Sequence, residues 1–138
     1  MTYLLDTNVC MAAMRGHPLV LEYLRAILPA DCGISTISIY EIYLAIAGCQ
    51  RPDIKHETVE NLIGAVNVLP FDPDAVKETA RIRHELEQRG ETVGLCDIMI
   101  AGQALSLGMT VVTQNTVEFQ KIPGLLVQDW KYNPQVPD

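Results

Sequence analysis

The chain has 138 residues, is 49% hydrophobic and 20% charged, and carries a formal charge of −7. This length and composition suit one compact domain over residues 1–138 and exclude global disorder. The negative charge argues against a nucleic-acid binder that neutralises many phosphates with lysine and arginine, unless divalent ions supply the positive charge locally.

Cysteine spacing and the length of apolar runs indicate in which cellular compartment the protein is expected. The four cysteines are too widely spaced for a zinc or disulfide framework, so we expect four reduced and mostly buried thiols at Cys10, Cys32, Cys49 and Cys96. No apolar run could span a bilayer, and the N-terminus lacks a basic region followed by a long apolar core. We therefore expect a cytoplasmic protein that begins at or near Met1.

Strand-like and helix-like segments alternate along the first half of the chain. A short apolar run at residues 2–5 predicts a buried strand that ends at Asp6. The next predicted elements are helices at 9–14 and 19–28, a strand at 32–36, and helices at 39–47 and 55–66. Ser38 followed by Glu41 matches a capping box at the start of the third helix.

The second half continues the alternation. Its predicted elements are a strand at 67–71, where Pro70 indicates an edge position or the strand's end, a helix from Pro73 to Gly90, a helix at 98–105 that Gly108 ends, and strands at 109–113 and 125–127. The apolar face of the helix after Pro73 is expected to carry Val76, Ala80, Ile82 and Leu86. Strands that alternate with helices in this order predict a three-layer α/β/α fold with a mainly parallel central sheet.

Four acidic residues follow predicted strands or lie near the starts of predicted helices, namely Asp6, Glu41, Asp97 and Glu118. Because the carboxyl ends of parallel strands meet at one edge of a sheet, we expect these side chains to project there together. Individually, Asp6 and Asp97 are also explained as helix N-caps. Glu41 is also explained as the capping partner of Ser38, and Glu118 as a solvated surface acid.

A cluster of carboxylates has a chemical consequence. Without a cation the four acids would repel one another, and such a cluster would have little structural purpose. Hard divalent cations such as Mg²⁺ or Mn²⁺ take oxygen ligands, usually one or two carboxylates together with water and substrate phosphate. The sequence therefore predicts a divalent metal site at this edge of the sheet.

Four short motifs resemble those of PIN-domain ribonucleases, most closely the VapC toxins of bacterial toxin–antitoxin pairs. The motifs are Leu4–Asn8, Ile37–Ile42, Val93–Ala101 and Val111–Phe119, and the ending from Ile122 to Trp130 is also similar to that family. Together they span nearly the whole chain. The resemblance implies a PIN-like fold and a Mg²⁺- or Mn²⁺-dependent endoribonuclease that cleaves RNA, such as a tRNA or another structured RNA.

The resemblance also implies roles for individual residues. The family's acidic triad corresponds to Asp6, Glu41 and Asp97. Thr113 corresponds to the hydroxyl that helps to hold the metal waters, and Thr7 and Asn8 are expected to support the site. In this scheme the two aspartates are the main metal ligands, and the glutamate orients or deprotonates the attacking water or shares the metal. The expected reaction is metal-assisted phosphodiester hydrolysis.

Two positions depart from the family pattern. Family members often carry an aspartate where this chain has Asn115, so the fourth carboxylate is supplied by Glu118, acting through a metal water, or is missing. A glycine is common four residues beyond the glutamate, where this chain has Ala45. The second change is expected to affect packing more than chemistry.

Partners follow from the same resemblance. It implies a homodimer and a small VapB-type antitoxin whose C-terminal segment lies in an apolar groove and reaches the acids with an arginine or lysine. The apolar surplus of residues 19–28 and 55–66 supports self-association. The RNA contacts would fall to scattered cations, each also explained as solvated surface charge, at Arg15, Lys55, Arg81 and Arg83.

Two other functions are compatible with parts of the pattern. A response-regulator-like signalling domain also clusters acids around Mg²⁺, but it needs a lysine after a late strand, and none occurs between Thr113 and Lys121. A catalytically idle PIN domain that acts only by binding its partner is favoured by one feature, Asn115.

Overall fold

A computed structural model describes residues 2–27 and 29–130. Its centre is a five-stranded sheet in the order β3-β2-β1-β4-β5, and all four strand pairs are parallel. The strands are β1 (Tyr3–Leu5), β2 (Cys32–Ser35), β3 (Asn67–Leu69), β4 (Thr110–Val112) and β5 (Val127–Gln128). This confirms the predicted parallel sheet and the edge position of the strand after residue 66.

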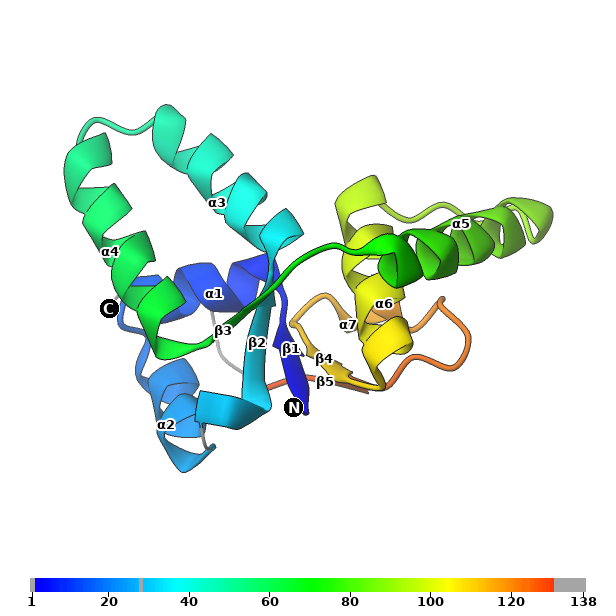
Figure 1. The fold of residues 1–138 in the computed structure, drawn as a ribbon, viewed down its shortest axis with the longest axis horizontal. Coiled ribbons are helices and arrows are strands. Elements are labelled where there is room, and N and C mark those ends of the chain that lie inside the picture. The colour runs from blue at the N-terminus through cyan, green and yellow to red at the C-terminus, as the bar shows by residue number, and fades with distance from the viewer. Residues whose placement is uncertain (1, 28, 131–138) are drawn as a thin grey trace.

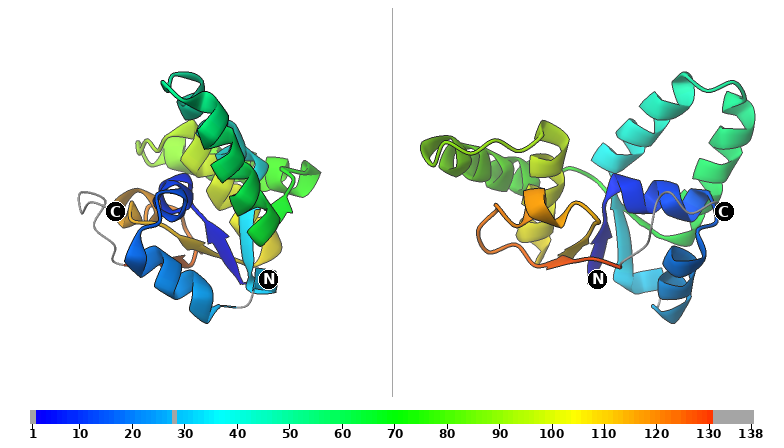
Figure 2. Two further views of the ribbon diagram at one scale, coloured as in Figure 1. Left: turned by 90° about the vertical axis from the view of Figure 1, so that its left-hand side faces the viewer. Right: turned by 180° about the vertical axis from the view of Figure 1, so that it is seen from behind.

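Helices cover both faces of the sheet, so the predicted three-layer α/β/α architecture is confirmed (Figure 1). The helices are α1 (Thr7–Met14), α2 (Pro18–Ala26), the 3-10 helix η1 (Pro29–Asp31), α3 (Thr36–Ala47), α4 (Pro52–Ala65), α5 (Pro73–Gln88), α6 (Leu95–Leu107) and α7 (Thr116–Phe119). Figure 2 shows from behind that α1 to α4 lie on one side of the strands and α5 to α7 on the other.

Two hydrophobic cores lie on opposite faces of the sheet because side chains alternate along each strand. Leu5 and Ile34 face the core that α1 to α4 complete, and Leu4 and Val111 face the core of α5 to α7. Trp130 closes the first core, with its ring stacked on that of Tyr23 at a centroid distance of 5.0 Å. The pleat of β1 therefore ties both layers to the strand that ends at Asp6.

The strand order reverses between β1 and β4. From β1 the chain builds β2 and β3 on one side, and it later adds β4 and β5 on the other. The loops that follow β1 and β4 consequently diverge, and in open parallel sheets this switch point is where ligands bind. Asp6 follows β1 and Thr113 follows β4, so both residues lie at this position.

The start of α3 differs from the prediction. The helix begins at Thr36, and its N-cap is Ser35, whose hydroxyl accepts a hydrogen bond of 3.0 Å from the backbone N–H of Ile37. Ser38 is therefore inside the helix and fully buried, and the predicted capping box with Glu41 is wrong. Pairing of β2 extends to Ser35, which lies opposite Leu69, and this register fixes where the strand gives way to the helix.

The buried face of α5 is also shifted. Its buried residues are Ala75, Thr79, Ile82 and Leu86, whereas Val76 and Ala80 are exposed. The predicted face was wrong at these two positions because α6 presents Gly102 to Thr79. A Cβ atom at Gly102 would lie 2.2 Å from the Thr79 hydroxyl oxygen, so the two helices pack closely only with glycine there.

Smaller differences concern element ends and cysteines. Helix α6 begins at Leu95, earlier than predicted, and the last strand begins at Val127, two residues late. Cys49 is exposed and Cys96 is half-buried, so only two of the four thiols are buried. Gly108 has a φ of 68° and ends α6 as predicted. None of the helices in the described part of the chain is long and apolar enough to cross a membrane.

Candidate active site

Asp6 is held from two sides at the end of β1. Its Oδ1 accepts a 2.7 Å hydrogen bond from the Thr7 N–H, and its Oδ2 accepts one of 2.7 Å from the Thr113 hydroxyl. Asp6 caps α1, as the N-cap interpretation predicts. Thr113 also fixes its second oxygen, and only 3% of the residue is exposed. Burial, the largest cause, raises the pKa of Asp6, and these two hydrogen bonds partly offset the effect.

Glu41 lies on α3, one turn after Ser38. One carboxylate oxygen accepts a hydrogen bond from the Thr7 hydroxyl, whose oxygen is also 3.0 Å from the Ser38 hydroxyl oxygen. The Cys96 thiol lies close enough to Glu41 to interact with its carboxylate. Burial and the neighbouring charge of Glu41 raise the pKa of Cys96, so this thiol stays protonated at neutral pH.

Asp97 lies in the first turn of α6 and not at its N-cap, which is Gly94. The N-cap alternative for Asp97 is therefore wrong. Burial and, in decreasing order, the charges of Asp6, Glu41 and Glu118 together raise the pKa of Asp97 to about 6. The four acids, which are far apart in the sequence, are thus close enough to repel one another.

The turn after β4 supports the site through Thr113. The hydroxyl of this buried residue donates to Asp6 and accepts a 2.9 Å hydrogen bond from the Asn115 N–H. Asn115 makes this contact through its backbone, so the contact does not depend on the amide side chain. Glu118 is bound by Lys121, whose Nζ is 3.0 and 3.1 Å from its two carboxylate oxygens and also donates to the Thr92 carbonyl.

A pocket of about 280 Å³ collects the first three acids. Its lining residues are Asp6, Thr7, Asn8, Met11, Glu41, Leu44, Ala45 and Asp97. Glu118 and Thr113 are not among them. The structure therefore brings Asp6, Glu41 and Asp97 to one cavity and leaves Glu118 beside it, paired with a lysine.

The donor set of this pocket fits a hard divalent cation. It offers carboxylate oxygens, and the pKa values of Asp6 and Asp97 are raised, first by burial and then by the charges of neighbouring acids. Among the described residues, no three acidic, histidine or cysteine side chains surround a common point as a finished ligand set. The residues thus suit Mg²⁺ or Mn²⁺ in chemical type, and water or substrate phosphate would complete the coordination.

The cations proposed for RNA contact are partly engaged elsewhere. Arg81 pairs with Glu78 and Glu85 along α5, and Arg83 pairs with Glu87. These side chains form solvent-exposed ion pairs on one helix, as expected of solvated surface charge.

The sequence did not predict Ser38 and Lys121 as parts of the site. Their spacing of three residues from Glu41 and Glu118 is the signal that could have pointed to them.

The comparison with known families decides the identity of this fold. A family model described as the PIN domain matches residues 3–125. The chain belongs to the PIN-domain family. This PIN domain is 36% identical over 131 residues to "tRNA(fMet)-specific endonuclease VapC" of Salmonella typhimurium, covering 93% of this chain and 97% of the relative. It is 33% identical over 132 residues to "Ribonuclease VapC1" of Haemophilus influenzae, covering 94% and 98%.

Solved structures agree with these relatives. The PIN domain superposes with a TM-score of 0.90 on a chain of the DNA-bound VapBC of Salmonella typhimurium, at 35% identity and covering 94% of this chain and 98% of that one. FitAcB from Neisseria gonorrhoeae gives a TM-score of 0.85 at 26% identity, covering 96% and 100%. The resemblance to VapC proteins inferred from the four motifs is confirmed.

The metal-free PIN domain is expected to lose stability as the pH rises from about 4 to about 6. An unfolded aspartate titrates near pH 3.9, whereas the folded pKa of Asp97 is about 6. Between these values the folded chain holds a proton that the unfolded chain has released, so raising the pH favours unfolding. Urea unfolding in EDTA across this window, for wild type and Asp97→Asn, measures the effect. Equal pH slopes for the two proteins would contradict it.

Proposed function

We propose that this PIN domain is a Mg²⁺- or Mn²⁺-dependent endoribonuclease and acts as the toxin of a toxin–antitoxin pair. The observation that carries the proposal is the convergence of Asp6, Glu41 and Asp97 in one pocket at the switch point of the sheet. Relatives that match over almost their whole length are named ribonucleases, and three carboxylates in one pocket exceed what the N-cap role of Asp6 requires. Metal-assisted hydrolysis of RNA accounts for both facts.

The proposed chemistry assigns a task to each side chain. A divalent ion bound here would supply a Lewis acid that stabilises negative charge developing on the scissile phosphate. Asp6 and Asp97 would hold it, and the Thr113 hydroxyl keeps Asp6 in one orientation. Glu41, which Thr7 orients, would accept a proton from the attacking water. Glu118 would play a lesser part than expected from the sequence, because Lys121 neutralises it.

RNA is the proposed substrate class. The relatives from Shigella flexneri and Salmonella typhimurium are named as endonucleases specific for tRNA(fMet), so a tRNA or another structured RNA is the first substrate to test. The acidic pocket repels phosphate by itself, and a bound cation would reverse that repulsion locally. Asn115 favours an idle domain that acts only by binding its partner. Its backbone nevertheless completes the support of Thr113.

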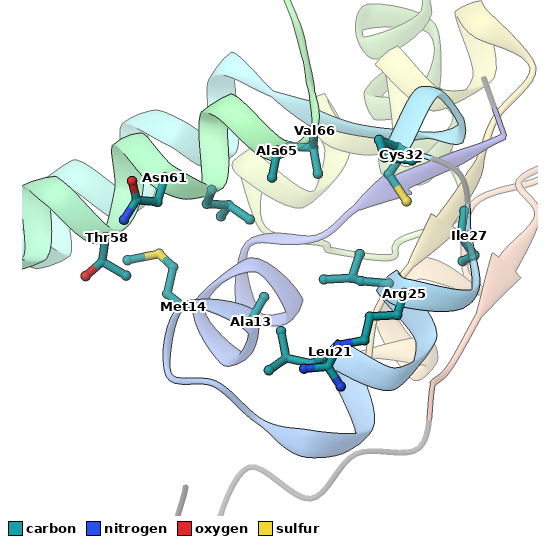
Figure 3. A pocket seen from close by; sticks show the side chains of 13 residues that line it. Ala13, Met14, Leu21, Arg25, Ile27, Cys32, Thr58, Asn61, Ala65 and Val66 are labelled. Carbon is teal, nitrogen blue, oxygen red and sulfur yellow. The ribbon is translucent and has the colours of Figure 1, made fainter.

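An antitoxin of the VapB type is the proposed partner. Relatives in the solved structures are VapBC complexes. In this PIN domain a mostly apolar groove of about 380 Å³ lies between α1, α2 and α4, where Arg25, Thr58 and Asn61 are its polar residues (Figure 3). The groove shares no lining residue with the acidic pocket. An amphipathic antitoxin segment would bury its apolar side chains in this groove.

The rim of the acidic pocket also suits a covering protein segment. Three apolar side chains line the pocket beside the acids, namely Met11, Leu44 and Ala45, and Leu44 is exposed. A basic side chain of the antitoxin would enter the pocket while neighbouring apolar residues cover this rim. Arginine suits that contact because its planar fork binds a carboxylate through two hydrogen bonds.

Site and groove variants are expected to separate the two activities. Glu41→Gln or Asp97→Asn should weaken Mn²⁺ binding more than antitoxin binding, because the groove supplies most of the affinity for the partner. Ala65→Glu places a charge on an exposed wall of the groove and should do the reverse, with Ala80→Glu on α5 as the matched control. Calorimetry measures both affinities. Loss of antitoxin binding in Glu41→Gln with unchanged Mn²⁺ affinity would contradict this division.

Self-association is proposed as well, although the apolar surface is distributed differently from expectation. On α4 the side chains of Val59, Leu62 and Ile63 pack against the core. Exposed apolar residues occur on α2, at Leu19 and Tyr23, and on α3. A symmetric pair would bury such a surface, and light scattering of the purified protein tests the mass.

Induced expression in cells tests the proposed function. Expressed alone, the PIN domain should stop growth and cleave cellular RNA. Co-expressed with its upstream neighbouring gene, it should do neither. Growth arrest with intact RNA would contradict the nuclease and support the idle alternative, in which binding alone causes the effect.

A further inference from the structure

Two threonine hydroxyls hold the acids of the site in the same way. The Thr113 hydroxyl donates to Asp6 and receives the N–H of Asn115 at 2.9 Å. The Thr7 hydroxyl contacts Glu41 and lies 3.0 Å from the Ser38 hydroxyl. In both cases the threonine oxygen has a second polar neighbour besides the carboxylate. Thr113 and Ser38 are both fully buried, and Thr7 is 7% exposed.

Counting protons fixes the direction of the contacts around Thr7. A hydroxyl carries one proton, and an ionised carboxylate can only accept. The Thr7 proton therefore goes to Glu41, which leaves the Thr7 oxygen as the acceptor for the Ser38 proton. If Ser38 directed its proton elsewhere, two hydroxyl oxygens would face each other at 3.0 Å without a proton between them. The hydrogen bonds thus run from Ser38 to Thr7 and from Thr7 to Glu41.

We infer that Ser38 is a positioning residue for Glu41 and acts through Thr7. This role of Ser38 rests on the proposed function, because Glu41 matters for the reaction only if the PIN domain is a nuclease. Ser38 is one turn before Glu41 on α3, and Thr7 is the first residue of α1. The pair of hydroxyls therefore links the starts of two helices at the point where the carboxylate enters the pocket. Donation from Ser38 prevents rotation of the Thr7 hydroxyl away from Glu41.

A double-mutant cycle tests whether Ser38 acts through Thr7. Thr7→Val keeps the side-chain shape and the backbone N–H to Asp6 but removes the hydroxyl. Because hydrogen bonds to charged groups are the strong ones, we expect Thr7→Val to lower Mn²⁺ affinity and kcat by roughly 10-fold or more. Ser38→Ala should lower both by a few-fold. The double variant should be no worse than Thr7→Val alone, since the second change then has nothing left to remove.

Controls separate positioning from folding. Ser35→Ala removes another buried hydroxyl from the start of α3, but this one accepts the hydrogen bond of the Ile37 N–H that caps the helix. It should lower the unfolding temperature and spare Mn²⁺ affinity and kcat. Ser38→Thr should restore both quantities because it restores the hydroxyl. If Ser38→Ala does not fold, Ser38→Cys retains a side chain of similar size with a weaker donor and should show the same loss.

Three outcomes would overturn the inference. Wild-type Mn²⁺ affinity and kcat in folded Ser38→Ala or Ser38→Cys would show that Glu41 does not need Ser38. Full additivity in the double variant would show that Ser38 does not act through Thr7. An equal loss in Ser35→Ala would reduce Ser38 to a structural residue. Failure of the wild type to cleave RNA would instead contradict the proposed nuclease. The Mn²⁺ affinities of the variants, measured by calorimetry, would still show whether Ser38 positions Glu41.

Discussion

Asp6→Asn is expected to reduce RNA cleavage by about three orders of magnitude and to leave the fold intact. A metal ion contributes several kcal/mol to such reactions, and each 1.36 kcal/mol is a tenfold change in rate, so losing its main ligand gives a loss of this order. The fold should survive because burial already disfavours the Asp6 charge, as its raised pKa shows, and asparagine has the same shape. Gel assays and thermal melts measure both quantities.

The matched control for this variant is Asp74→Asn. Asp74 is an exposed acid in the first turn of α5, and it does not line the acidic pocket. Its replacement should leave cleavage unchanged. Cleavage by Asp6→Asn at the wild-type rate would contradict the assignment of Asp6, whereas unfolding of Asp6→Asn would contradict the claim that its charge is kept for function and not for stability.

Gly102→Ala is expected to destabilise the protein strongly. The added Cβ would lie 2.2 Å from the Thr79 hydroxyl oxygen, 2.9 Å from the Thr79 nitrogen and 3.0 Å from its Cα, so α5 and α6 would have to separate. Overpacking of this kind typically costs about 1–3 kcal/mol, and contact with backbone atoms places the effect at the upper end. Thr79 cannot turn away easily, because its hydroxyl donates to the Ala75 carbonyl at 2.7 Å.

Gly64→Ala provides the opposite case. Gly64 is also a helical glycine, in α4, but nothing lies within 4 Å of a Cβ built there. Alanine favours a helix over glycine by up to about 1 kcal/mol, so this variant should be as stable as wild type or more stable. Urea unfolding of the two variants measures the difference. Similar free energies of unfolding for both would contradict the close packing of α5 on α6.

The sheet and its functional edge could be predicted from the sequence because they depend on local patterns. Short apolar runs end in polar side chains at Asp6 and Thr113, and this pattern alone indicates buried parallel strands whose carboxyl ends meet. The order of strands and helices then fixed the three-layer architecture. Positions after strands and near helix starts selected the four acids, and the four motifs that resemble the PIN family assigned three of them to an acidic triad.

What the sequence did not predict depends on contacts between distant segments. Hydroxyl residues at 35, 36 and 38 all suit an N-cap, and only the pairing of β2 with β3 decides for Ser35. The buried face of α5 follows from Gly102 on another helix. The role of Ser38 depends on Thr7, which is 31 residues away. The secondary-structure propensities of local sequence carry no information on these contacts.

Cleavage of RNA by the purified, antitoxin-free PIN domain, with metal removed and then restored, is the most direct measurement. If Asp6, Glu41 and Asp97 hold a divalent ion, RNA should be cut in Mg²⁺ or Mn²⁺, should stay intact in EDTA, and should be cut again when an excess of the ion is added. Undiminished cleavage in EDTA, or cleavage that persists in Asp6→Asn, would contradict the metal-dependent site.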